Sequence, residues 1–187
     1  MLQNVLAYVI IPVYTVLFAR DTDLFTTNFS VIGSTNGRQN AFFLWGILVG
    51  WYFFRELKGI LPLVPNSGRE HRVTITACVL LALAVSTPYL PDRLPFQAAF
   101  HVVCAFSSSV LLLSCMYSLI LKLYRRDRSS YRPYLTGISV TACLSAILLF
   151  AAGIVSSALE IFFTISCTIL IRRLHRKLYR GQLKGIK

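Results

Sequence analysis

Charged residues are scarce in this chain, and acidic residues are the scarcest. Only 14% of the 187 residues are charged, with seven Asp and Glu against nineteen Lys and Arg. A typical soluble domain is about 25% charged and about 45–50% apolar, whereas 56% of this chain is apolar. This composition argues against a water-soluble fold and predicts a protein whose main solvent is lipid.

Metal-binding and redox motifs are also missing from the sequence. The five cysteines form no CxxC pair, the three histidines have no repeated spacing, and no HExxH occurs. A metal site made of His101, Glu160 and a loop Asp is conceivable but matches no known ligand spacing. We therefore expect no metal and no cofactor, and we expect the cysteines to pack inside apolar segments.

Long apolar runs are what the sequence does contain. Between Arg132 and Arg172, 39 residues include a single charge, Glu160. One helix of that length would measure about 58 Å, about twice the hydrocarbon thickness of a bilayer, so a break is expected at 153–157, where Gly and Ser permit a turn. The sequence predicts one all-α membrane domain with six transmembrane helices at 2–19, 41–57, 73–89, 96–121, 134–153 and 157–172, followed by a basic tail at 173–187.

The basic residues alternate between the two sides of these predicted spans. Sixteen Lys and Arg fall in the second and fourth connections and in the tail, and three fall on the opposite side. By the positive-inside rule, this predicts a cell-membrane protein with both termini in the cytoplasm. The net charge of +12 is thereby explained by topology, and no nucleic-acid partner is expected.

Polar side chains within apolar runs are candidate functional residues, because polar groups at membrane depth are costly. His101 lies about six residues, or about 9 Å, inside the fourth run, and Glu160 lies a few residues inside the sixth. Both belong to the same side, which the loop at 20–40 also covers. Since a His beside a carboxylate can act as a general base, we predict His101, Glu160 and Ser30 as catalytic residues.

The same loop supplies the predicted binding residues, which are Asp21, Asp23, Asn28 and Arg38. An Arg in this set can hold a phosphate, so the group suits lipid head-group chemistry. The plainer interpretation is that Glu160 reaches interfacial water and that His101 only hydrogen-bonds a neighbouring helix.

Three further features concern helix packing. Gly46 and Gly50 form a GxxxG motif, which permits either close packing within the chain or dimerisation. Pro12 is expected to kink the first helix. The serines at 107–109 are expected to bond across to another helix or back to their own.

Three short motifs resemble those of a known group of membrane proteins. They are Asn28-Phe29-Ser30-Val31-Ile32-Gly33, His101-x-x-x-Ala105 and Ser157-x-x-Glu160. The chain resembles the DRAM, Frag and Sfk superfamily and its bacterial relatives, whose members are six-helix membrane proteins linked to lipid remodelling or organisation. The resemblance implies a lipid-related role and supports His101 and Glu160 as functional residues. This chain departs from the pattern at Val31, where an acidic residue is expected.

Several functions remain open at the level of sequence. The first is a membrane protein that binds or modifies lipid at a polar site in the outer leaflet. The second is a substrate-binding subunit of a vitamin-type transporter, and the third is a structural or assembly protein. A channel is disfavoured because few ionisable groups are available to line a path. The expected partners are membrane lipids and, where the chain assembles, a further copy or another membrane protein.

Overall fold

The computed structural model describes residues 1–35 and 37–185, and in these ranges every regular element is helical and no strand occurs. The all-α prediction is confirmed. The last two residues of the predicted basic tail, 186 and 187, lie outside the described residues. The elements are α1 (Leu2–Val5), η1 (Leu6–Ile10), α2 (Ile11–Phe18), α3 (Phe29–Ser34), α4 (Gln39–Ile60), η2 (Leu61–Leu63), α5 (Gly68–Ser86), α6 (Pro95–Arg126), α7 (Arg128–Ala152) and α8 (Ser157–Gly185).

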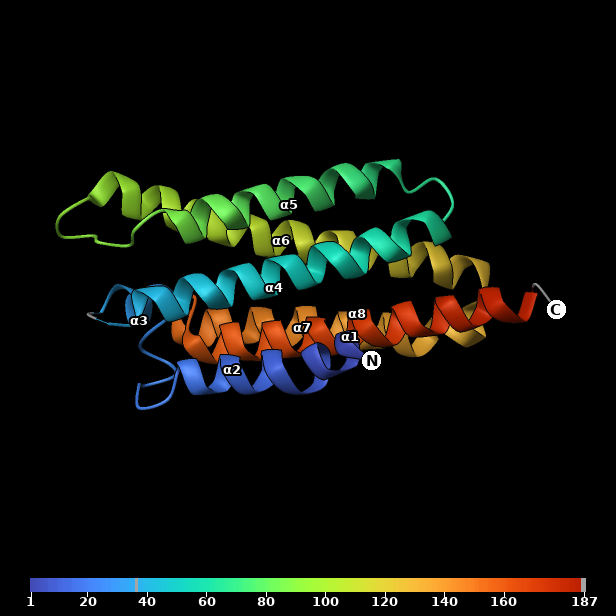
Figure 1. The fold of residues 1–187 in the computed structure, drawn as a ribbon, viewed down its shortest axis with the longest axis horizontal. Helices are drawn as coiled ribbons and strands as arrows, with labels where there is room; N and C mark the ends of the chain where they lie inside the picture. Colours follow the sequence, from blue (N-terminus) through green and yellow to red (C-terminus); the bar gives the residue numbers. More distant parts are fainter. Residues whose placement is uncertain (36, 186–187) are drawn as a thin grey trace.

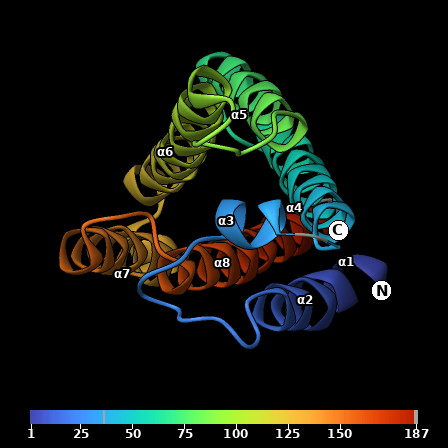
Figure 2. The same cartoon turned by 90° about the vertical axis from the view of Figure 1, so that its left-hand side faces the viewer.

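The long helices form a ring. Helices α4, α5, α6, α7 and α8 each pack on the next, and α8 closes the ring by packing on α4 (Figure 2). Helix α2 lies outside this ring against α4 and α8. The short α3 lies across one end of the bundle, which we name the α3 end, and the C-terminus lies at the opposite end, the tail end (Figure 1).

Several helices extend further than their apolar runs. The residues from Arg128 to Arg132, predicted to lie in a loop, form the first turns of α7. Asp127 alone separates α6 from α7, and its carboxylate caps α7 by accepting from the Ser130 N–H at 3.0 Å. The predicted break after the fifth run is confirmed, since Gly153 ends α7 with a φ of 68°.

The N-terminal helix contains a π-helical turn where the sequence predicts a kink. Proline has no N–H and its ring crowds the carbonyl four residues back, which for Pro12 is the carbonyl of Tyr8. The helix widens just before that point, in η1, and the N–H of Ile11 donates to the carbonyl of Leu6, five residues back. The segment from Leu2 to Phe18 thereby remains continuous.

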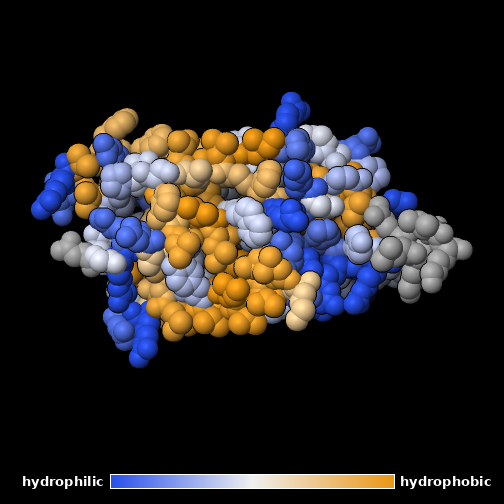
Figure 3. All heavy atoms as spheres, in the orientation of Figure 1, coloured by the Kyte–Doolittle hydropathy of each residue, from blue (hydrophilic) through white to orange (hydrophobic). Residues whose placement is uncertain are grey.

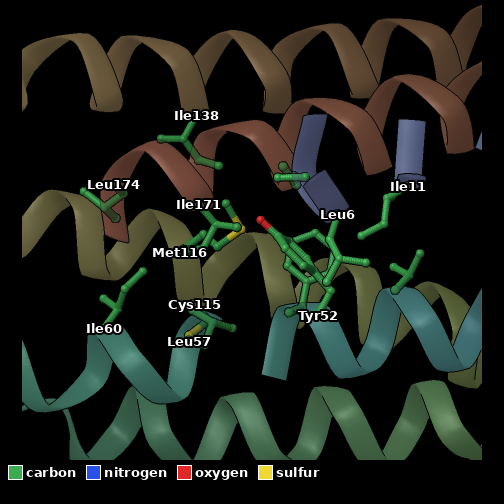
Figure 4. Close-up of a cluster of buried hydrophobic side chains, with 14 of the residues drawn as sticks. Leu6, Ile11, Tyr52, Leu57, Ile60, Cys115, Met116, Ile138, Ile171 and Leu174 are labelled. Atoms are coloured by element: carbon green, nitrogen blue, oxygen red, sulfur yellow. The ribbon is translucent and has the colours of Figure 1, made fainter. Parts of the chain in front are cut away.

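The core extends from the ring to the N-terminal helix. Buried side chains from α4, α6, α7 and α8 meet with Leu6 and Ile11 of the N-terminal helix (Figure 4). Tyr52 donates its hydroxyl to the Thr168 carbonyl at 3.1 Å. A Cβ atom on Gly46 would lie 2.4 Å from Val85, and one on Gly50 would lie 3.1 Å from Leu81. The GxxxG motif therefore packs α4 on α5 within the chain.

The serines at 107–109 follow both predictions for them. Ser108 donates its hydroxyl across the helix interface to the Ala77 carbonyl at 2.7 Å. Ser109 donates to the Ala105 carbonyl, four residues back on its own helix, at 3.1 Å. The first bond ties α6 to α5, and the second leaves Ser109 on the face of α6 toward α7 and α8, where it lines a cavity described below.

Large apolar side chains remain exposed around the middle of the molecule, while hydrophilic ones gather at both ends (Figure 3). Two helices in the described part of the chain, α6 and α7, are long and apolar enough to cross a membrane, and the apolar segment Leu2–Phe18 is shorter. A monomeric soluble protein rarely exposes so much contiguous apolar surface.

Candidate functional site

Helix α3 is held in place by hydrogen bonds at its N-terminal end and in the loop that precedes it. At its start, the Asn28 side chain accepts from the Val31 N–H at 2.9 Å and caps the helix. The preceding loop is tied to α8, because the N–H groups of Ser157 and Ala158 donate to the carbonyls of Thr27 and Leu24 at 2.7 and 2.8 Å. These bonds satisfy free N–H groups at the start of α8 and fix where α3 begins.

Phe29 anchors α3 to the aromatic side chains of α2 and α4. Its ring is fully buried and packs edge-on against Phe18 and Trp45, with centroid distances of 5.1 and 4.9 Å. Its N–H donates to Glu160 Oε2 at 2.7 Å. The next residue, Ser30, is thus presented from a backbone that is fixed by a buried ring and by a carboxylate.

Ser30 and His101 are in direct contact. The Ser30 hydroxyl lies 2.6 Å from His101 Nε2. The other ring nitrogen, Nδ1, lies 2.7 Å from the Ala84 carbonyl and 2.9 Å from the Thr87 carbonyl, both at the end of α5. The His101 side chain is 1% exposed, and its bond to the Ala84 carbonyl is buried, whereas its bonds to Ser30 and to the Thr87 carbonyl are partly buried.

The two carbonyls determine which nitrogen of His101 carries the proton. A carbonyl oxygen only accepts hydrogen bonds, so Nδ1 must be the protonated nitrogen of a neutral ring. Nε2 is then an acceptor, and the Ser30 hydroxyl donates to it. This is the relation between a nucleophile and its general base in serine hydrolases, with backbone carbonyls in the orienting role that an Asp takes there.

Two cavities meet at Ser30. The α6–α8 cleft, of about 490 Å³, is lined by His101, Glu160, Asn28 and many apolar side chains of α6, α7 and α8. The α3–α5 hollow, of about 260 Å³, is lined at the α3 end by α3, the start of α4 and the residues that follow α5. Ser30 and Tyr89 line both.

The predicted catalytic residues are therefore brought together, but Glu160 has a different contact from the one expected. Its carboxylate holds the Phe29 N–H, and the orienting partners of His101 are the carbonyls of Ala84 and Thr87. Glu160 lines the same cleft as His101. Through its hydrogen bond to the Phe29 N–H, Glu160 positions α3.

Of the predicted binding residues, only Asn28 lines this site. Asp21 pairs with Arg20 at 3.7 Å on the surface. Asp23 accepts two N–H groups of its own turn, from Phe25 at 2.8 Å and from Thr26 at 2.9 Å, and these bonds lower the pKa of its carboxyl group.

Arg38 also lies away from both cavities. Its guanidinium points to the Phe18 and Arg20 carbonyls at 3.4 and 3.5 Å, and it is not among the residues that line either cavity. The predicted phosphate-holding Arg is thus occupied by the loop at the end of α2.

Tyr89 and the two carbonyls at the end of α5 are the site features that the sequence did not predict. The last carbonyls of any helix lack partners within it, so free acceptors near Ser86 could have been anticipated. Their alignment with His101 depends on how α5 packs beside α6. Tyr89, whose ring centre lies 5.6 Å from that of His101, follows Pro88 in a loop without any distinguishing motif.

A second polar region at the tail end binds helices together through charge. Glu56 is fully buried and accepts from Arg172 at 3.1 and 3.3 Å and from His175 Nδ1 at 2.8 Å. Arg172 also donates to Asn4 at 2.8 Å. Buried Glu70, in turn, accepts from Lys122 at 2.8 Å. These pairs join α4 to α8 and α5 to α6.

Comparison of the chain with protein-family models, with curated proteins and with solved structures finds no match.

Proposed function

We propose that this chain is a six-span membrane protein that cleaves or transfers an acyl ester of a lipid at its α3 end. The contact between Ser30 and His101 carries the proposal. In this scheme Ser30 is the nucleophile, His101 is the general base, and Glu160 and Asn28 position α3.

The surface and the charge distribution support the membrane placement. Exposed apolar side chains surround the middle of the molecule (Figure 3), as expected of a surface that faces lipid. Sixteen of the nineteen Lys and Arg belong to connections and tail on one side, which supports a topology with the tail end in the cytoplasm and the α3 end outside. The resemblance to the DRAM, Frag and Sfk superfamily agrees with a lipid-directed role.

The chemistry follows from the proton positions. Ser30 Oγ attacks the ester carbonyl carbon and its proton passes to His101 Nε2. That proton then goes to the departing alcohol, which leaves an acyl group on Ser30. Water, or a second lipid hydroxyl, attacks this acyl-serine with His101 again as base. Asn28 and Tyr89 also line the cleft, and in this scheme the Asn28 amide and the Tyr89 hydroxyl donate to the ester carbonyl oxygen as it gains negative charge.

The two cavities indicate the class of substrate. On α6 the α6–α8 cleft runs from His101 to Leu113, about 18 Å at 1.5 Å per residue, which suits an acyl chain. Seven of the thirteen residues that line the α3–α5 hollow are polar without formal charge, and the other six are apolar or glycine; the polar ones are Ser30, Ser34, Gln39, Asn40, Ser86, Thr87 and Tyr89. Among the described lining residues of both cavities no Lys or Arg occurs. We therefore propose a neutral head group rich in hydroxyls, such as glycerol or a sugar.

Release of fatty acid in proteoliposomes tests the proposal. The purified chain is reconstituted with diacylglycerol, with a glycosyl diacylglycerol or with phosphatidylcholine, and released acid is measured by mass spectrometry. Ser30→Ala and His101→Asn are expected to lower the rate by at least about 10³-fold. Thr35→Ala is the matched control, because the Thr35 hydroxyl donates to the Ile32 carbonyl at 2.6 Å and Thr35 lines neither cavity.

Neutral lipids are expected to react faster than phosphatidylcholine. No acid release from any ester lipid by the wild-type chain, or equal release by the folded Ser30→Ala variant, would show that the proposed reaction is wrong.

A further inference from the structure

The tail end contains a cleft that the proposed reaction does not use. This α7–α8 cleft, of about 650 Å³, is lined by Ser130, Tyr134, Arg173, Arg176, Lys177, Arg180 and Gly181. Its volume is within the range of ordinary small-molecule sites, about 300–1,000 Å³. Four of the seven lining residues are cations, and none is acidic.

The cations come from one face of α8. Arg173, Arg176, Lys177 and Arg180 are spaced three, four and seven residues apart, which aligns them along a helix. Like charges at this spacing repel one another. Among the described residues, none of these four cations forms a salt bridge with a carboxylate. Hydrogen bonds from Ser130 lower the pKa of the Asp127 carboxyl group, and an electrostatic interaction with Lys177 helps to lower it.

Lys177 differs from the three arginines because the protein itself holds it. Its ammonium donates to the Ser130 carbonyl and lies 4.6 Å from the ring centre of Tyr131 and 5.5 Å from that of Tyr134, within cation–π range. These contacts fix one wall of the cleft.

For the three guanidinium groups, no hydrogen bond, ring contact or salt bridge to another described side chain is found. They present planar donors that suit phosphate oxygens.

We infer that the α7–α8 cleft binds a phosphate-bearing group with Arg173, Arg176 and Arg180. The site lies at the end of the bundle opposite Ser30, next to further basic residues at the junction of α6 and α7. Two sources have this chemistry, a phosphorylated lipid head group in the adjoining leaflet and a soluble sugar phosphate. The inference does not depend on the reaction proposed for Ser30.

Native mass spectrometry of the detergent-solubilised full chain tests the inference. The probes are dioctanoyl phosphatidylinositol 4-phosphate, dioctanoyl phosphatidylcholine, inositol 1,4-bisphosphate and inorganic phosphate. Arg173→Gln/Arg176→Gln is compared with Arg69→Gln/Arg72→Gln, which removes the same charge from exposed residues of α5 outside the cleft. The cleft pair is expected to weaken binding of the phosphorylated probe by at least about tenfold, because each Arg contributes charge-assisted hydrogen bonds.

Each outcome bears on the site. Preferential binding of the phosphoinositide, lost in the cleft pair alone, supports a lipid head group as the source. Equal binding of inositol 1,4-bisphosphate, lost in the same pair, supports a soluble phosphate. Equal weakening by both pairs, or no preference over phosphatidylcholine, overturns the inference. A Ser30→Ala variant is expected to bind as the wild type does, which separates this test from that of the proposed reaction.

Discussion

The two ends of this molecule organise their polar groups in different ways. At the α3 end, His101 is oriented by the carbonyls of Ala84 and Thr87 and faces the hydroxyl of Ser30. No fixed charge contacts the imidazole there among the described residues. At the tail end, buried Glu56 binds Arg172 and His175, and a cleft between α7 and α8 gathers four cations.

The difference follows from the chemistry of the buried group at each end. A buried neutral imidazole needs an orienting acceptor but gains little from a full charge, and backbone carbonyls supply that acceptor without a second ionisable group. A buried carboxylate at a helix junction needs compensation by charge. The α3 end, where no fixed charge contacts the imidazole, suits the proposed reaction on an uncharged lipid, and the charged tail end joins helices and suits the proposed anion site.

The largest expected effect concerns stability at the tail end. Glu56→Ala leaves Arg172 and His175 without their shared partner, and breaking a buried pair in this way costs about 3–5 kcal/mol. Denaturant or thermal unfolding in detergent measures the loss. Arg55→Ala, at the exposed neighbouring position, should change the unfolding free energy by less than about 0.5 kcal/mol. Equal losses in the two variants would remove the distinction drawn for Glu56.

The second prediction concerns the acyl cleft. Ala142 lines the α6–α8 cleft and its neighbour Cys143 does not, so Ala142→Trp should fill the cleft and Cys143→Trp should leave it open. Cleavage of long-chain esters is expected to fall about 10²-fold in the first variant, with short-chain esters much less affected, since misplacing a substrate has effects of this size. A uniform loss for all chain lengths would contradict the assignment of this cleft to the chain.

The third prediction separates charge from position at Glu160. Gln retains an oxygen that can accept from the Phe29 N–H, and Ala does not. Glu160→Gln is expected to keep activity within about twofold, while Glu160→Ala lowers it about tenfold, the size of one hydrogen bond to a charged group. Initial rates on a neutral ester lipid provide the measurement. If Gln is as damaging as Ala, the carboxylate takes part in the reaction itself.

The fourth prediction concerns the contact of α4 with α5, which both ends share. A methyl group on Gly46 would overlap Val85, so Gly46→Ala should destabilise the protein by about 1–3 kcal/mol. Val85→Ala in the same chain should recover part of this loss. A double-mutant cycle of unfolding free energies gives the coupling, and a coupling of zero would mean that the close approach does not limit stability.

The apolar runs predicted where the helices lie, because uncharged stretches and their Gly or Pro boundaries are local properties. They did not predict that α7 begins at Arg128, since the Asp127 cap and a continuous helix through Pro133 override the charged composition of that segment. The shared height of His101 and Glu160 followed from counting residues along each run, and both line one cleft.

Other features of the site depend on tertiary packing and have no local signal. The carbonyls that orient His101 belong to α5, and Arg38 turns to the carbonyls at the end of α2 instead of to the cleft. The sequence predicted that Arg38 binds a phosphate, because arginine suits phosphate in general. The position of the Arg38 side chain depends on the path of the loop from Arg20 to Asn28.

Covalent labelling of Ser30 tests the central claim most directly. An alkyl fluorophosphonate is incubated with the reconstituted protein, and the modified peptide is identified by mass spectrometry. The account predicts one adduct on Ser30 that is absent in Ser30→Ala. The adduct should form at least about tenfold more slowly in His101→Asn, which has no basic nitrogen, and at an unchanged rate in Thr35→Ala, since Thr35 lines neither cavity. No adduct on Ser30, or the same labelling rate with and without His101, would contradict the assignment of these two residues as nucleophile and base.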